Sequence, residues 1–148
     1  MNLSDNYNLS DIKVLENVKF EKLEKLDLSH NNISNINILE NVNFKELKEL
    51  SLSNNYNLSD IKVLENVKFE KLEKLDLSHN NICNINILKN VNFKELKELS
   101  LSNNKISDIK VLENVKFEKL EKLNLKNNKI DTNECSSIIA NSKYKVIV

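Results

Sequence analysis

The amino-acid sequence predicts an α/β fold in which short repeats stack into a curved solenoid. A parallel β-sheet is expected on the concave side, short helices or turns on the convex side, and a helix–strand cap at the C-terminus. The pattern Leu-x-x-Leu-x-Leu-x-x-Asn begins at five positions that lie 24 or 25 residues apart: Leu23, Leu47, Leu72, Leu96 and Leu120. The Leu-x-Leu triplet in each copy has the two-residue alternation of a strand. Spaced apolar residues follow each Asn, and self-similarity at this period is typical of stacked repeats.

The strand of each repeat is expected around its Leu-x-Leu triplet, such as Leu26-Asp27-Leu28. Strands this short cannot bury an apolar face alone, but parallel strands stacked about 4.8 Å apart share one leucine core. An asparagine follows each strand, and its inward amide can satisfy backbone groups of the turn that would otherwise lack partners. These structural asparagines are Asn31, Asn55, Asn80, Asn104 and Asn128. Residues 14–20 and their copies are expected to cross the convex side as a short helix or helical turn.

One domain is expected over residues 1–148, with a truncated first repeat at 1–22, full repeats at 23–130 and a C-terminal cap at 131–148. Residues 131–134 resemble a helix capping box, and Cys135, Ile138 and Ile139 follow at helical spacing. We therefore expect a helix that ends near Ser142, followed by a final strand at 144–148. This cap would cover the open C-terminal end of the core.

The N-terminal end has no such cap, because the chain begins inside a repeat. Either it is a fragment of a longer array, or another chain covers that end. The strand edge near Leu3 and the core side chains Leu9, Ile12 and Leu15 are expected to be uncovered. This predicts a weak homodimer through the N-terminal end.

Composition excludes several classes of function. The chain of 148 residues has no Gly and no Pro, so glycine-dependent nucleotide and phosphate motifs are absent. Its net charge is zero, which argues against a nucleic-acid or membrane-surface partner. Two distant cysteines and no apolar run of about 18 residues indicate a reducing, cytoplasmic setting without a membrane span. A signal peptide removed earlier would leave the same sequence, so secretion stays open.

No catalytic, cofactor-binding or metal-binding constellation is evident, and the chain is expected not to be an enzyme. His30 and His79 occupy one repeat position two strands apart, hence about 10 Å apart, which is too far to share a metal ion. Asp27 and Asp76 are separated in the same way. Cys83 replaces Ser34 in an equivalent turn and has no neighbouring base in sequence, so it is not expected to be a nucleophile.

The repeat resembles the leucine-rich repeat, whose pattern is L-x-x-L-x-L-x-x-N/C-x-L, over residues 2 to 130. The stretch from Asn104 to Ile109 is similar to the short repeats of internalins and of phosphatase-regulating repeat proteins. The resemblance implies a module that binds another protein on its concave face or rim. The outward positions of that face are Lys25, Asp27, Ser29, His30, Glu49, Ser51, Ser53, Lys74, Asp76, Ser78, His79, Glu98, Ser100, Ser102, Asn124 and Lys126. Tyr7 and Tyr56, in turns one residue longer than the others, are the aromatic candidates.

The charges alternate from repeat to repeat. One column is expected to contain Lys25, Glu49, Lys74, Glu98 and Lys122, and the next has the opposite signs. Each charge would then lie between two opposite charges on neighbouring strands. Residues 3–55 and 52–104 differ at three aligned pairs only, so the duplicated unit is two repeats long. A recent duplication and consensus engineering both explain this similarity.

Three functions follow as hypotheses. The first is a non-enzymatic module that binds a partner protein through the concave face or its rim. The second is a structural or self-assembling repeat without a dedicated ligand, which the near-identity of the two-repeat units favours. The third, a regulatory subunit of an enzyme such as a phosphatase, depends on the family resemblance alone.

Overall fold

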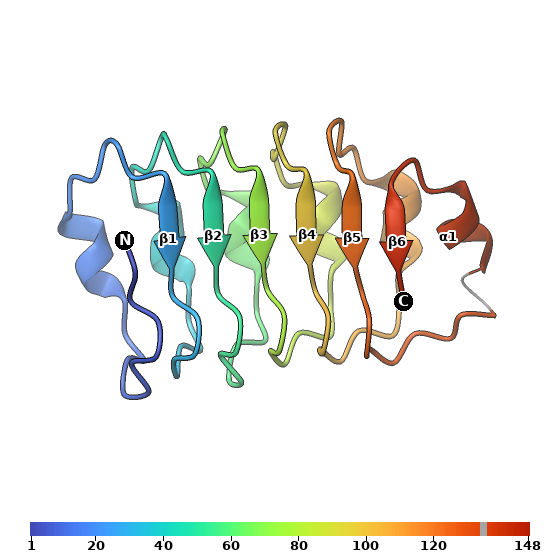
Figure 1. Ribbon diagram of the computed structural model, residues 1–148, viewed down its shortest axis with the longest axis horizontal. Coiled ribbons are helices and arrows are strands. Elements are labelled where there is room, and N and C mark those ends of the chain that lie inside the picture. Colours follow the sequence, from blue (N-terminus) through green and yellow to red (C-terminus); the bar gives the residue numbers. More distant parts are fainter. Residues whose placement is uncertain (134–135) are drawn as a thin grey trace.

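The computed structural model describes residues 1–133 and 136–148. Its strands pair in parallel, in chain order, to form one open sheet (Figure 1). They are β1 (Lys25–Asp27), β2 (Glu49–Ser51), β3 (Lys74–Asp76), β4 (Glu98–Ser100), β5 (Lys122–Asn124) and β6 (Lys145–Ile147). Leu26, Leu50 and Leu75 face one another in register, and the same alignment continues to β6. The predicted α/β solenoid with its parallel sheet is confirmed.

Short 3-10 helices lie behind the sheet, on the convex side (Figure 1). They are η1 (Lys13–Asn17), η2 (Asn37–Glu40), η3 (Lys62–Glu65), η4 (Asn86–Lys89) and η5 (Lys110–Asn114). An Asp or Asn side chain starts each one: Asp60 Oδ1, for example, accepts the backbone N–H of Lys62 at 2.8 Å. Such an Asx turn favours a tight helical turn, so the convex segments are short helices of the 3-10 type.

The core fills the space between the sheet and the 3-10 helices. Leu28, Ile33 and Phe44 are buried, and so are their equivalents in the following repeats as far as Leu125, Ile106 and Phe117. Because successive rungs are nearly identical, the same positions contribute to the core in each rung. The result is one continuous core rather than a set of separate clusters.

The asparagine ladder behaves as predicted from Asn31 onward. Asn55 Nδ2 donates to the carbonyl oxygens of Leu28 and Leu52, both at 3.0 Å, and its Oδ1 accepts the N–H of Ile33 at 2.9 Å. Within residues 1–133 and 136–148, every buried side-chain nitrogen or oxygen has a hydrogen-bond partner. The first member of the ladder, Asn6, is exposed.

The extra residue of the two long turns changes which amide reaches the ladder. In turns without it, the residue two positions after the asparagine donates, as Ile33 does to Asn55 Oδ1. In the turns that contain Tyr7 and Tyr56, the asparagine itself donates: the N–H of Asn55 reaches Asn80 Oδ1 at 2.9 Å. The ladder thus accommodates an insertion without leaving a buried group unpaired.

A second column lies at the strand exits and has left-handed backbone conformation. Its members have φ between 54° and 58°: Asp5, His30, Asn54, His79, Asn103 and Asn127. Glycine usually occupies such positions, and this chain has none. Asp, Asn and His are the non-glycine residues that adopt this conformation most readily. The backbone turn therefore explains why the residue types at this position are so restricted.

The C-terminal cap is close to its predicted position. Helix α1 (Ser136–Asn141) ends one residue before the expected Ser142, and β6 lies inside the expected strand at 144–148. Strand β6 pairs with β5, while α1 packs near η5 and buries Ile138. Of the residues expected to start this helix, Glu134 and Cys135 lie outside the described part of the chain.

The N-terminal segment adds to the edge of β1, as Asn2 bridges to Asp27 in parallel. The expectation that Ile12 and Leu15 are uncovered is wrong, because both are 2% exposed. Both belong to the continuous core. Val14 and Phe20 are exposed at that end instead, at 65% and 38%, and Leu9 is half-buried.

Candidate binding surface

A shallow groove of about 390 Å³ runs along the concave face from β1 to β5. Short side chains at the third position of each strand form its middle column: Asp27, Ser51, Asp76, Ser100 and Asn124. The lysines and glutamates at the first strand position lie along one side. Because β1 to β5 each contribute equivalent positions, the groove extends across these strands, and β6 does not line it.

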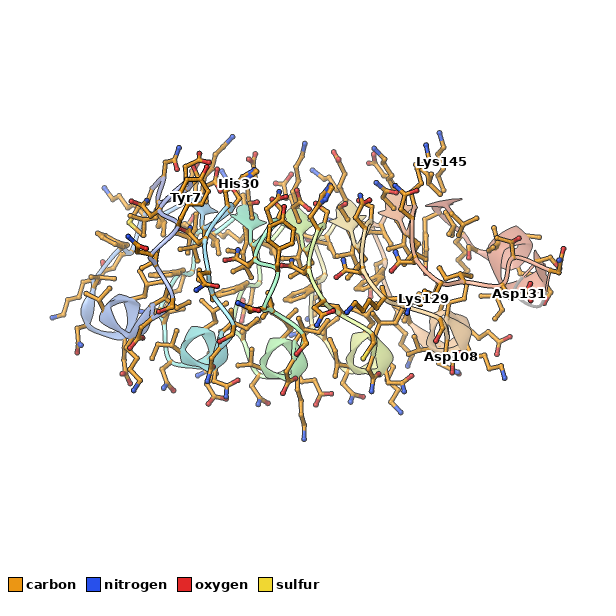
Figure 2. All side chains as sticks on the ribbon, turned by 90° about the horizontal axis from the view of Figure 1, so that it is seen from below. Tyr7, His30, Asp108, Lys129, Asp131 and Lys145 are labelled. Carbon is orange, nitrogen blue, oxygen red and sulfur yellow. The ribbon has the colours of Figure 1, made fainter. Side chains whose placement is uncertain are left out.

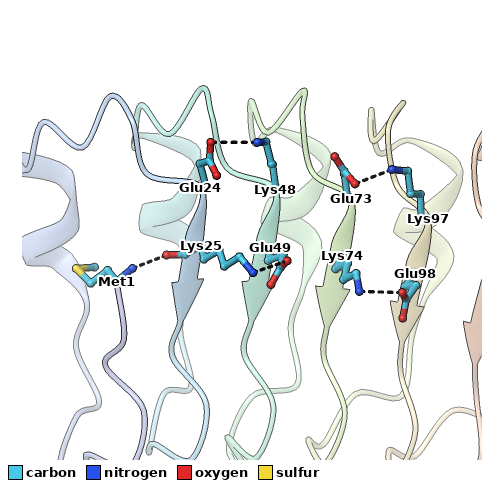
Figure 3. Close-up of polar contacts among 9 residues, drawn as sticks. All are labelled: Met1, Glu24, Lys25, Lys48, Glu49, Glu73, Lys74, Lys97 and Glu98. Carbon is cyan, nitrogen blue, oxygen red and sulfur yellow. Dashed lines mark hydrogen bonds and ion pairs between the residues drawn. The ribbon is translucent and has the colours of Figure 1, made fainter.

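Six ion pairs join neighbouring rungs in the described part of the chain. Lys25 Nζ lies 2.9 Å from Glu49 Oε1, and Lys74 Nζ lies 3.0 Å from Glu98 Oε1 (Figure 3). The adjacent column contains Lys48–Glu24 at 3.0 Å and Lys97–Glu73 at 2.6 Å. A third column contains Lys71–Glu46 at 2.7 Å and Lys119–Glu95 at 2.6 Å.

The strand register confirms the expected alternation of charges, with each inner charge between two opposite ones. The ion pairs join only some of these neighbours. Glu49 lies between Lys25 and Lys74 but pairs with Lys25, and Lys122, at the end of the column, has no ion pair within the described residues. Pairs in the first two columns join β1 to β2 and β3 to β4, and pairs in the third column join the rungs of β2 to β3 and β4 to β5. The alternation therefore links all five rungs.

Hydrogen bonds within these pairs shift several pKa values. The Lys71 ammonium lowers the pKa of Glu46, and the Lys97 ammonium lowers the pKa of Glu73. The Glu24, Glu98 and Glu73 carboxylates raise the pKa of Lys48, Lys74 and Lys97, respectively. All of these groups are exposed to solvent, so salt screens the attraction.

The middle column of the groove also caps the strands. Asp27 Oδ1 accepts from the backbone N–H of Ser29 at 2.9 Å and from its hydroxyl at 2.6 Å. Asp76 Oδ1 accepts the N–H of Ser78 at 2.9 Å, and Asn124 Oδ1 accepts the N–H of Lys126 at 3.1 Å. These side chains are half-buried, so a partner in the groove would contact both their polar atoms and the strands beneath them.

The serines that lie two residues after the middle column were expected to be outward positions of the concave face, and the structure differs. Ser29, Ser53, Ser78 and Ser102 alternate outward from the sheet, yet each is buried, with 7–8% of its surface exposed. Ser29 Oγ donates to Asp27 Oδ1 at 2.6 Å, and Ser53 Oγ lies 3.2 Å from Ser51 Oγ. These hydroxyls therefore bond to side chains that line the groove. Lys126 occupies the equivalent position after β5 and is exposed.

The two histidines lie at the rim, where the strands end. His30 Nε2 lies 3.3 Å from Asn54 Nδ2, and His79 Nε2 lies 3.2 Å from Asn103 Nδ2. Among the described residues, no group of three His, Cys, Asp or Glu side chains could hold a metal ion. The rim therefore offers hydrogen-bonding groups.

The turn tyrosines are strongly exposed. Tyr7 and Tyr56 have 73% and 69% of their surface in solvent, and Figure 2 shows Tyr7 near His30 at the N-terminal end of the molecule. Tyr56 Oη donates to Asn54 Oδ1 at 3.3 Å.

Cys83 is an exposed free thiol. No helix in the described residues is long and apolar enough to cross a membrane.

Comparison with protein families finds leucine-rich repeats in three parts of the chain. A model of two leucine-rich repeat copies matches residues 94–136, and single-repeat models match residues 21–36 and 71–91. No curated protein matches the chain at a significant level.

Solved structures with the same architecture include two internalins of Listeria monocytogenes. Internalin C2 is 29% identical with a TM-score of 0.68 over 88% of this chain, and the second is 27% identical with a TM-score of 0.62 over 99%. A leucine-rich repeat protein of Leptospira interrogans is 25% identical with a TM-score of 0.75 over 95%. The chain spans 54%, 55% and 35% of these three structures, respectively, so it corresponds to about half or a third of their length.

Proposed function

Because the chain belongs to the leucine-rich repeat proteins, we propose that it binds another protein in the groove along the concave face of its sheet. Proteins of this family are commonly interaction modules. The observation that carries the proposal is the groove itself, which continues across β1 to β5 and has short side chains along its middle. A groove this long and shallow fits an extended or helical polypeptide better than a small molecule.

The chemistry of the groove supports a polar partner surface. Its middle column offers carboxylate, hydroxyl and amide groups, and its flanking column offers lysine and glutamate side chains. Trp, Tyr and Arg, the usual anchors of tight interfaces, do not line it. The rim tyrosines, Tyr7 and Tyr56, are the aromatic side chains available to a partner that extends over the strand exits.

Blocking the groove tests this function. The double variant Ser51→Arg/Ser100→Arg places two long side chains in the middle column and should abolish recovery of partners from a native lysate. The matched control is Ser59→Arg/Ser107→Arg, which adds the same charge at two exposed positions outside the groove. Equal recovery by both variants, with unchanged melting curves, would contradict binding through the concave face.

Self-association through the N-terminal end is a second candidate, favoured by the exposure of its apolar side chains. Val14 is 65% exposed, whereas its equivalents Val63 and Val111 are 6% and 7% exposed beneath a preceding rung. Phe20 is 38% exposed, and Phe44, which contacts it, is 1% exposed. In the 148-residue chain a second copy could cover these side chains and the edge at Leu3.

Sedimentation equilibrium at micromolar concentrations tests this candidate. Wild type should show a concentration-dependent dimer, and Val14→Ser/Phe20→Ser should be monomeric. Tyr56→Ser, which removes a more exposed aromatic ring away from the end, should dimerise like wild type. A strictly monomeric wild type would reject the candidate and leave concave-face binding untouched.

A further inference from the structure

We propose that the β5–β6 end of the concave face binds an acidic polypeptide segment. This proposal rests on the function proposed above, because it specifies the charge of the partner and the end of the concave face that this charge occupies, where Lys122 lines the groove and Lys126 and Lys145 lie beyond its lining. Three lysines carry it: Lys122, Lys126 and Lys145.

The sheet brings these lysines to one place. Lys122 and Lys145 are direct neighbours in the register of β5 and β6, so two positive charges lie side by side where every earlier strand pair has opposite charges. Strand alternation puts Lys126 on the same face as Lys122. All three are exposed, and none forms an ion pair within the described residues.

The neighbouring carboxylates do not neutralise this cluster. Glu98 faces Lys122 across β4 and β5, but its Oε1 is engaged by Lys74 Nζ at 3.0 Å. Glu121 precedes Lys122 and forms no ion pair within the described residues, and its single carboxylate leaves the three lysines with a net positive charge. The cluster therefore keeps a positive charge that is free to bind an anionic group.

The middle column shows the same change of charge at β5. Asp27 and Asp76 cap the residues that follow β1 and β3, and Asn124 makes the equivalent hydrogen bond after β5. Asparagine keeps the cap and removes the negative charge, so the backbone has the same support without a carboxylate near the lysines. Because aspartate makes the same cap after β1 and β3, the fold does not require an uncharged residue at Asn124. An acidic ligand would favour this uncharged residue.

The remainder of the groove has the opposite sign. Along β1 to β4 its outward side chains include four carboxylates, on Asp27, Glu49, Asp76 and Glu98, and two lysines. A partner with one acidic end would be attracted to β5–β6 and repelled by the other strands. This polarity would set the direction in which an extended segment lies along the groove.

A labelled octaglutamate peptide is the probe, with binding measured by fluorescence anisotropy at low salt. The triple variant Lys122→Gln/Lys126→Gln/Lys145→Gln should weaken binding about tenfold, which is the scale expected for three exposed charge contacts. The matched control Lys13→Gln/Lys62→Gln/Lys110→Gln removes the same charge from the convex side and should bind like wild type.

A single substitution sharpens the test. Asn124→Asp should keep the cap and the melting curve and should weaken octaglutamate binding about threefold. Asn84→Asp is its control, because Asn84 starts η4 as Asp60 starts η3, far from the groove. Equal losses in the two triple variants, or no effect of Asn124→Asp relative to Asn84→Asp, would overturn the proposal. If the groove-blocking variant still loses its lysate partners in that case, concave-face binding survives and only the acidic partner is rejected.

Discussion

Lys74 Nζ lies 3.0 Å from Glu98 Oε1, while Lys122, the register neighbour on the other side of Glu98, has no ion pair in the described part of the chain. Each glutamate of this column therefore has one engaged lysine and one lysine at longer range. The engaged contact stabilises a particular pair of rungs, and the longer-range contact contributes only a screened attraction.

Replacing Glu98 with lysine tests the column directly. Glu98→Lys places lysines on four successive strands, β3 to β6, and should lower the melting temperature by roughly 2–4 °C, with the loss decreasing as salt is added. Thermal unfolding at low and high ionic strength measures this. A loss that does not depend on salt would show that the charge column is not its cause.

The ion pairs also predict acid sensitivity. The pKa of Glu73 is lowered by Lys97, so the pair stabilises the fold fully above the ordinary glutamate value of about 4.3 and loses this contribution as pH falls through the lowered value. Glu73→Gln should therefore reduce the difference in stability between neutral and acid pH, as followed by urea unfolding. Glu70→Gln is the control, because Glu70 has no ion pair within the described residues. Equal effects of the two variants would contradict a role for the Glu73–Lys97 pair.

Most of the fold could be predicted from the period of the repeat, because a fixed spacing places Lys25, Glu49 and Lys74 in register without knowledge of the turns. The individual ion pairs could not be predicted, because the side-chain conformations decide which of two oppositely charged neighbours forms the ion pair. The buried serines were missed because alternation gives the direction of Ser29 but not the depth of the neighbouring rungs. Alternation and spacing also do not show how deeply Ile12 and Leu15 are buried in the first rung, so the expectation that they are uncovered is wrong.

The left-handed column lacks the usual sequence signal, because glycine normally marks such positions and this chain has none; the restriction to Asp, Asn and His is the weaker signal that it leaves. It makes a prediction at His79, whose φ is 55°. His79→Val should destabilise the fold by roughly 1–2 kcal/mol, because a β-branched residue is strained there. His79→Gly removes the same ring and keeps the conformation accessible, so it should stay within about 0.5 kcal/mol of wild type. Equal destabilisation in chemical unfolding would attribute the effect to the imidazole rather than to the backbone.

The asparagine ladder carries the strongest prediction. Asn55 is fully buried, and its side chain binds the N–H of Ile33 and the carbonyls of Leu28 and Leu52. Asn55→Ala leaves these buried groups without partners and should destabilise the protein by about 3 kcal/mol in urea unfolding. Asn57→Ala is the matched control, because Asn57 lies in the same turn and its side chain bonds Asn32 Oδ1 at an exposed position; it should lose less than about 0.5 kcal/mol. If Asn55→Ala were as stable as Asn57→Ala, water would be replacing the amide, and the ladder would not hold the turns together.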